Sequence, residues 1–201
     1  MTAPRLIVFT DRSCAEPEFM LARFEDLGRR AQPGSVLFTV RDYTLSARAR
    51  WQLAERLARM ARATKQRLGV ADRADLARAF GCTGFHLPEG GMTAADARRY
   101  LGSRVFLTRA CHDLSRAAEV ELNARLVSPI FEPRKGRAAL GLAALSRASG
   151  AGQCTAFALG GVSAGNAAAC LGAGAGGVAV IGAALAPDPA PLLLALGILR
   201  V

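Results

Sequence analysis

The sequence predicts a single α/β domain folded as a (β/α)8 TIM barrel over residues 1–201. Apolar β-type runs alternate with alanine- and arginine-rich helical runs along the whole chain, and we count eight of each. The β-type runs are apolar on both faces, as parallel strands covered by helices should be. Strand–helix alternation implies right-handed βαβ units and a parallel sheet. Eight units within 201 residues favour a small closed barrel, because an open doubly wound sheet usually has fewer strands.

The predicted strands are short apolar runs. In chain order they are RLIVFTD (5–11), SVLFTVRD (35–42), QRLGVAD (66–72), TGFHLP (83–88), RVFLTRA (104–110), RLVSPIF (125–131), TAFALGG (155–161) and GGVAVIGA (176–183). Helices are predicted at residues 16–31, 45–63, 73–80, 93–101, 113–122, 138–148, 163–172 and 189–199.

Helix 45–63 shows the 3.6-residue period of an amphipathic helix. Its apolar stripe consists of Leu45, Ala49, Leu53, Leu57 and Met60. Thr93 and Ser163 stand immediately before two other predicted helices, where a hydroxyl side chain can accept a hydrogen bond from a free backbone amide. We therefore expect both residues to be N-caps.

The composition favours a folded cytoplasmic protein. Hydrophobic residues make up 51% and charged residues 21%, which allows a buried core. The run MTAPRLIVFTD meets an acidic residue too early for a secretory signal, and glycines and polar residues interrupt the uncharged run 148–187, so we expect no membrane segment. Five scattered cysteines without a C-x-x-C pair indicate neither a zinc site nor a disulfide framework.

The formal net charge of +10 raises the question of an anionic partner. Only Lys65 and Lys135 of the 26 basic residues are lysines, and such an arginine excess is also typical of genomic base composition. The basic stretch 41–67 contains only Tyr43 and Trp51 as aromatic residues for base stacking. We therefore expect a phosphorylated small molecule as the partner, and no nucleic acid.

The last two predicted strands end in glycine-containing turns. These turns are Gly160, Gly161, Val162 and Ile181, Gly182, Ala183. In TIM barrels the loops after strands seven and eight are the usual phosphate site, because glycine exposes backbone amides and helix N-termini favour negative charge. We predict that the two turns bind the phosphate of the ligand. The alternative is that the glycines only allow helix and strand to pack closely.

The C-terminal run ALGGVSAGNAAACLGAGAGGVAVIGAAL resembles the phosphate-binding signature of the thiamine phosphate synthase and TenI family. DRADLARAFGCTGFHLP, RACHDLSRAAEVE and LVSPIFEPRKG resemble further motifs of that family, in the same order along the chain. The resemblance implies a TIM barrel that binds a thiazole phosphate or thiamine phosphate in thiamine biosynthesis.

The second strand departs from the residues that the resemblance implies for a synthase. A synthase joins a pyrimidine pyrophosphate to a thiazole phosphate, and it needs cations and Mg²⁺ on the leaving pyrophosphate. Leu37 and Thr39 stand where the family has Gln and Arg, and Arg41 alone keeps a positive charge.

The metal-binding positions implied by the resemblance are also incomplete. Ala71 replaces the Asn of an Asn-Asp pair, so that only Asp72 remains, and Gly91 stands at the place of a second metal-binding Asp. Asp72 and Glu89 are the remaining candidates for a metal or for substrate contacts. The sequence therefore does not predict a particular cofactor with certainty. Mg²⁺ is expected only if synthase activity persists.

The TenI branch of the family is more similar in HLP (86–88) and FEPRKG (131–136). Some members of that branch are thiazole tautomerases, which move a proton on a thiazole carboxylate phosphate. The resemblance implies His112 as the catalytic acid/base, and Arg41 or Lys135 as the residue that holds the ligand carboxylate. His86 is expected to be a packed structural residue, and Cys111 is not expected to form a nucleophilic pair with His112.

Two alternatives to a tautomerase remain open. One is a divergent thiamine phosphate synthase that uses Arg109, Arg134 or Arg137 for the pyrophosphate. The other is a protein that binds the phosphorylated ligand as a regulator without catalysis. The resemblance also suggests a homodimer, since relatives are often dimeric, although no sequence feature defines an interface.

Overall fold

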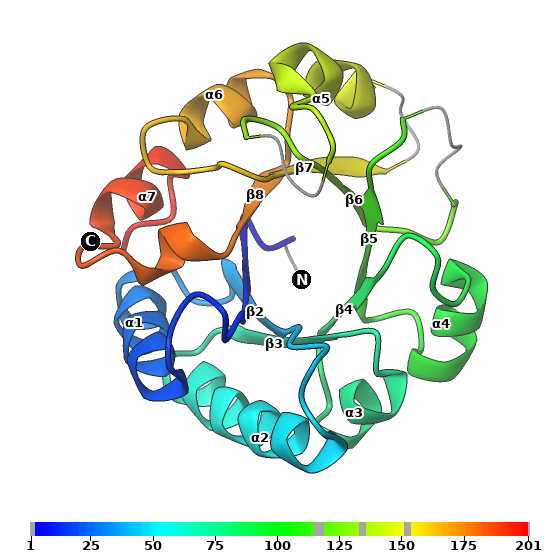
Figure 1. Cartoon of the computed structure of the whole chain (residues 1–201), viewed down its shortest axis with the longest axis vertical. Helices are drawn as coiled ribbons and strands as arrows, with labels where there is room; N and C mark the ends of the chain where they lie inside the picture. Colours follow the sequence, from blue (N-terminus) through cyan, green and yellow to red (C-terminus); the bar gives the residue numbers. More distant parts are fainter. Residues whose placement is uncertain (1–2, 115–118, 133–135, 151–153, 201) are drawn as a thin grey trace.

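Eight parallel strands close into a barrel in chain order, and the last strand pairs with the first (Figure 1). A computed structural model describes residues 3–114, 119–132, 136–150 and 154–200 of the chain. The helices form an outer ring around the strands (Figure 1). The predicted TIM barrel is confirmed.

The strands are four to six residues long. They are β1 Leu6–Phe9, β2 Val36–Val40, β3 Arg67–Ala71, β4 Gly84–Leu87, β5 Phe106–Cys111, β6 Ala124–Val127, β7 Thr155–Leu159 and β8 Gly177–Val180. The helices are α1 Pro17–Arg30, α2 Ala47–Ala63, α3 Ala74–Ala79, α4 Ala94–Leu101, α5 Gly141–Gly150, α6 Ala167–Gly172 and α7 Ala190–Ala195, with a 3-10 helix η1 at Gly182–Leu185.

One predicted helix is wrong over the residues that the structure describes. Residues 113–114 and 119–122 are not helical. Glu119 instead forms an ion pair with Arg109 and accepts a hydrogen bond from the amide of Ala94 at 2.6 Å. These contacts with β5 and α4 override the helix propensity of the segment.

The N-cap predictions have different outcomes. Thr93 caps α4, since its hydroxyl oxygen accepts a hydrogen bond from the amide of Asp96 at 3.1 Å. Ser163 is not an N-cap, because α6 begins only at Ala167, after Asn166. The predicted strand 176–183 is also too long, because β8 ends at Val180 and η1 follows.

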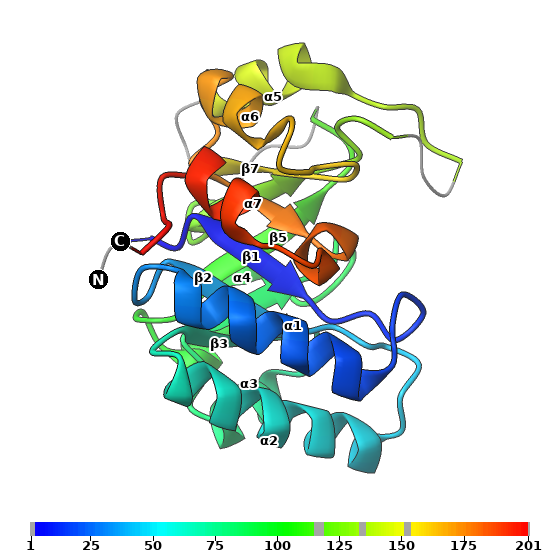
Figure 2. The ribbon, with the colours of Figure 1, turned by 90° about the vertical axis from the view of Figure 1, so that its left-hand side faces the viewer.

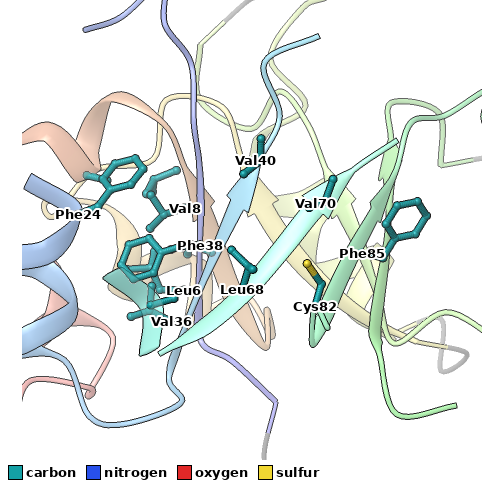
Figure 3. Packing of buried hydrophobic residues seen from close by; sticks show 14 of the residues in the cluster. Leu6, Val8, Phe24, Val36, Phe38, Val40, Leu68, Val70, Cys82 and Phe85 are labelled. Atoms are coloured by element: carbon teal, nitrogen blue, oxygen red, sulfur yellow. The ribbon is translucent and has the colours of Figure 1, made fainter. Parts of the chain in front are cut away.

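The strand side chains alternate between two apolar layers, as the two-residue period of a strand requires. One layer lies between strands and helices, where Leu6, Val8 and Phe38 meet Phe24 of α1 (Figure 3). The other layer fills the inside of the barrel. Its buried members are Ile7, Phe9, Leu37, Phe106, Ala124, Leu126, Phe157 and Ala179.

Glycines on β3 and β4 make room for Leu37 inside the barrel. A Cβ atom on Gly84 would lie 2.6 Å from both terminal carbons of Leu37, and one on Gly69 would lie 3.2 Å from one of them. Leu37 therefore occupies the space that side chains on β3 and β4 would otherwise fill.

The C-terminal segment is tied to the end of α1. The amide of Gln32 donates to the carbonyl of Ile198 at 2.8 Å, and the amide of Arg200 donates to Arg30 at 2.7 Å. In the side view α7 lies next to α1, close to β1 (Figure 2). Among the helices of the described residues, none has the length and hydropathy needed to span a bilayer.

Candidate functional site

A cavity of about 280 Å³ opens at the carboxyl ends of the strands, where active sites of TIM barrels lie. It is lined by Phe9, Arg41, Tyr43, His86, Pro88, Glu89, Ala110, His112, Ser128, Pro129, Arg137, Leu159, Gly160 and Ile181. Each lining residue lies near the carboxyl end of a strand or in the loop after it, so the closure of the barrel brings together residues far apart in the sequence.

His112 follows β5 directly and is held by the end of β6. Its Nδ1 lies 2.9 Å from the backbone carbonyl oxygen of Ser128 and 3.1 Å from the Ser128 hydroxyl. A carbonyl oxygen only accepts hydrogen bonds, so Nδ1 carries the hydrogen and Nε2 of the neutral ring carries the lone pair. The ring is half-buried in the cavity wall. The geometry gives the predicted acid/base residue an oriented ring with one basic nitrogen.

Glu89 lies beside His112, after β4. Its carboxylate accepts a hydrogen bond from the backbone amide of His112 at 3.2 Å. Glu89 is half-buried and lines the cavity. It brings a negative charge to the same wall as the imidazole.

Arg41 lines the cavity as predicted, but its guanidinium is already engaged. It donates a hydrogen bond to Asp11 Oδ2 at 2.6 Å. The guanidinium carbon also lies 5.9 Å from the centre of the Phe9 ring and 6.0 Å from that of Tyr43. Arg41 therefore offers a fixed and partly neutralised charge rather than a mobile one.

The two predicted phosphate turns differ in their packing. A Cβ atom on Gly160 would lie 2.9 Å from Pro129 Cα, and one on Gly161 would lie 2.8 Å from Glu132 Cγ. Both glycines have positive φ, +95° and +69°. Close packing against the β6 loop is thus one reason for these glycines, as the alternative interpretation held. A Cβ atom on Gly182 meets no atom within 4 Å.

Several backbone amides in the two turns have no hydrogen-bond partner among the described residues. Within the described ranges, the amides of Gly161, Val162, Gly182 and Ala183 make no hydrogen bond to the protein. Gly160 and Ile181 line the cavity itself, whereas Val162 is buried. Free amides at the edge of a cavity are the groups that an anion requires.

Asn166 stabilises the turn at residues 160–163, although the sequence analysis did not predict it as a site residue. Its side-chain amide donates to the carbonyl of Gly161 at 2.9 Å, and its Oδ1 accepts from the amide of Ser163 at 2.8 Å. Asn166 lies within ALGGVSAGNAAACLGAGAGGVAVIGAAL, the run that resembles the phosphate-binding signature, and this position was the sequence signal for its role. These two bonds hold the turn at residues 160–163 open.

His86 lies on the cavity floor and is packed as predicted. It is 5% exposed, its Nδ1 lies 2.9 Å from the Thr108 hydroxyl, and its ring meets Phe9 edge-on at 5.0 Å. Burial, and then the nearby charges of Arg41, Arg109 and His112, lower the pKa of His86 to about 3. The His86 ring is therefore neutral at physiological pH.

The other predicted ligand contacts have different outcomes. Asp72 is exposed, has a left-handed backbone with φ of +69°, and does not line the cavity. Lys135 and Arg134 lie outside the described residues. Arg137 does line the cavity, and its side chain is exposed.

The structure does not bring the two predicted metal candidates into one site. In the parts of the chain that the structure describes, no group of three His, Cys, Asp or Glu side chains converges. Asp72 and Glu89, the metal candidates, do not share the cavity. Leu37 and Thr39, where the resemblance implies polar pyrophosphate contacts, are 2% and 1% exposed and do not line the cavity.

Two further side chains are engaged in structural contacts. Arg109 donates to the carbonyls of Pro88 and Met92 at 2.8 and 2.7 Å and pairs with Glu119, so it ties loops together instead of lining the cavity. Cys111 is buried, and burial raises the pKa of its thiol, so it is a poor nucleophile.

The fold and the cavity define a TIM barrel with a cavity of small-molecule size at the carboxyl ends of its strands. A sequence profile described as thiamine monophosphate synthase, of the TMP-TENI family, matches residues 8–184. The chain belongs to this thiamine monophosphate synthase and TenI family of thiamine biosynthesis.

Several relatives are similar over most of their length. A Geobacter sulfurreducens protein, provisionally named thiamine-phosphate synthase, is 37% identical over 92% of this chain and 88% of its own. The thiamine-phosphate synthase of Thermus thermophilus is 35% identical over 86% of this chain and 87% of its own. The structure named thiamine phosphate pyrophosphorylase from Pyrococcus furiosus superimposes with a TM-score of 0.79 at 24% identity, covers 96% of this chain and 95% of its own, and supports the fold.

Proposed function

We propose that the protein binds a thiazole phosphate in this cavity and transfers a proton on its ring, as a thiazole tautomerase does. The observation that carries the proposal is the hydrogen bond from His112 Nδ1 to the Ser128 carbonyl, which leaves the basic Nε2 for the ligand. The free amides near Gly161 and Gly182 would bind the phosphate, and the exposed Arg137 would meet a ligand carboxylate.

The proton balance requires only one group. Nε2 of His112 would take a proton from one position of the thiazole ring and return it to another, so the imidazole ends as it began. Glu89, bonded to the His112 amide, would stabilise the imidazolium in between. No metal, oxidant or second substrate enters this reaction.

The second candidate is the synthase reaction, which the names of the relatives favour over the isomerase. It joins a pyrimidine pyrophosphate to a thiazole phosphate and releases pyrophosphate. Against it stand Leu37 and Thr39, whose buried side chains supply no charge to a pyrophosphate. Of the predicted metal candidates, only Glu89 lines the cavity.

An assay of both reactions on one preparation separates the candidates. The protein would be incubated in D₂O with thiazole carboxylate phosphate, and separately with the two synthase substrates, each with Mg²⁺ or with EDTA. We expect isomerisation in EDTA, seen by NMR, and no release of pyrophosphate. Magnesium-dependent pyrophosphate release without isomerisation would establish the synthase instead. Binding by calorimetry without either reaction would support the regulatory alternative.

A further inference from the structure

Tyr43 is an aromatic side chain at the mouth of the cavity to which neither proposed reaction assigns a role. It follows β2 in the loop before α2, lines the cavity and is 49% exposed. Burial raises the pKa of its phenol, so the hydroxyl stays protonated at neutral pH. Part of its surface therefore faces the cavity, and about half of it is exposed to solvent.

Two arginines hold the Tyr43 ring in place. The guanidinium carbon of Arg50 lies 5.5 Å from the ring centre, and that of Arg41 lies 6.0 Å from it. Both distances are within the range of cation–π attraction. A ring with cations on two neighbouring elements keeps its orientation before any ligand arrives.

Arg50 is itself fixed. It is buried on the first turn of α2, and its Nη2 donates a hydrogen bond of 2.5 Å to the carbonyl of Ala71 at the end of β3. A buried arginine bonded to a strand end cannot change rotamer without losing that bond. These contacts therefore connect the end of β3, through Arg50, to the Tyr43 ring.

The cavity floor provides further aromatic surface. Phe9 and His86 both line the cavity, and their rings meet edge-on with centres 5.0 Å apart. A planar ring in the cavity would meet this apolar, π-rich floor and the exposed part of Tyr43. A bare phosphate would gain nothing from it.

We propose that Tyr43 is a specificity-determining residue that stacks on the planar heteroaromatic ring of a phosphorylated ligand, with Arg50 as its positioning residue. The inference rests on the proposed function for the ligand class only, and it requires no chemical step. It predicts that Tyr43 contributes to binding of the ring and not of the phosphate.

Calorimetric titration of thiazole phosphate and of inorganic phosphate tests the inference. Tyr43→Ala should weaken thiazole phosphate on the order of tenfold and leave inorganic phosphate unchanged. Tyr43→Phe keeps the ring and should bind within about twofold of wild type. Tyr100→Ala is the matched control, because Tyr100 is 44% exposed and lies 5.1 Å from the Arg78 guanidinium, but does not line the cavity.

Arg50→Lys tests the positioning role, since it keeps the charge and removes the planar fork. We expect weaker thiazole phosphate binding, a raised KM with unchanged kcat where turnover exists, and normal inorganic phosphate binding. Unchanged ring affinity in Tyr43→Ala, or equal loss for both ligands, would overturn the inference.

The two proposals fail separately. Selective loss of thiazole phosphate binding in Tyr43→Ala, without isomerase or synthase turnover in wild type, would keep the inference and reject the proposed reaction. Isomerase turnover in wild type together with an unchanged KM in Tyr43→Ala would support the proposed reaction and reject the inference. Wild-type protein that binds no thiazole phosphate would overturn both.

Discussion

The backbone carbonyl of Ser128 lies 2.9 Å from Nδ1 of His112, so the end of β6 sets the tautomer of a side chain carried by β5. The two strands are neighbours in the barrel, and Cys111 pairs with Val127 immediately before the two residues. The register of one strand pair therefore defines the orientation of the candidate acid/base.

Replacing His112 should separate chemistry from binding. In His112→Asn we expect isomerase turnover to fall about 10²–10⁴-fold, because no other group takes the proton. Thiazole phosphate affinity, measured by calorimetry, should stay within a few fold, since the proposed phosphate contacts are backbone amides.

Ser128→Ala is the matched control for His112. It removes the hydroxyl 3.1 Å from Nδ1 and keeps the carbonyl at 2.9 Å, so kcat should change only a few fold. Equal and large losses in both variants would mean that the Ser128 hydroxyl is required for turnover as well as the ring.

The glycines of the two turns should respond differently to an added methyl group. Gly161→Ala forces a side chain into positive φ and places Cβ 2.8 Å from Glu132 Cγ, so the free energy of unfolding should fall by about 1–3 kcal/mol. The added methyl group of Gly182→Ala enters open space, so the free energy of unfolding should change by less than about 0.5 kcal/mol. Urea unfolding followed by the fluorescence of Trp51, the single tryptophan, measures both.

The buried His86 should make the protein acid-sensitive. Its folded pKa of about 3 is below the value in an unfolded chain, about 6.5, so between these pH values only the unfolded chain binds the proton. The contribution of His86 to the free energy of unfolding is fully present above about pH 6.5. It decreases as the pH falls towards 3, by up to about 1.4 kcal/mol per pH unit.

Urea unfolding at pH 7.5 and pH 5 would measure this acid sensitivity. His86→Gln, which cannot be protonated, should lose part of the difference between the two pH values. An identical pH dependence in the variant would assign the acid sensitivity to other groups.

Thiol labelling should follow burial. Burial raises the pKa of Cys82 to about 12 and that of Cys170 to about 11, whereas Cys14 is exposed. Iodoacetamide at pH 8 should label Cys14 within minutes and leave Cys82 and Cys170 unmodified until urea is added. Mass spectrometry of peptides reads the sites, and early labelling of Cys82 would contradict its burial.

The sequence was sufficient for the barrel because its strands are apolar on both faces and are separated by helical runs. It failed between β5 and β6, where local propensity favours a helix. Glu119 instead contacts Arg109 and the amide of Ala94, which are distant in sequence. Such tertiary pairings leave no periodic signal.

The candidate site was predictable where a residue type implies its chemistry, as for His112 and the glycine turns. Tyr43 and Ser128 were not predicted as site residues. In the sequence Tyr43 is only an aromatic residue within a basic stretch, and Ser128 contributes chiefly a backbone carbonyl, which any residue possesses. Arg41 reached the cavity as expected, but its pairing with Asp11 depends on the approach of the β1 and β2 loops.

Closure of the barrel also has a consequence for how the chain is made. Leu6 of β1 pairs with Val178 of β8, so one edge of the first strand has no partner until nearly the whole chain has left the ribosome. An open strand edge is a template for pairing with another chain. During synthesis, this edge is a place where a chaperone or a second nascent chain could pair before β8 arrives.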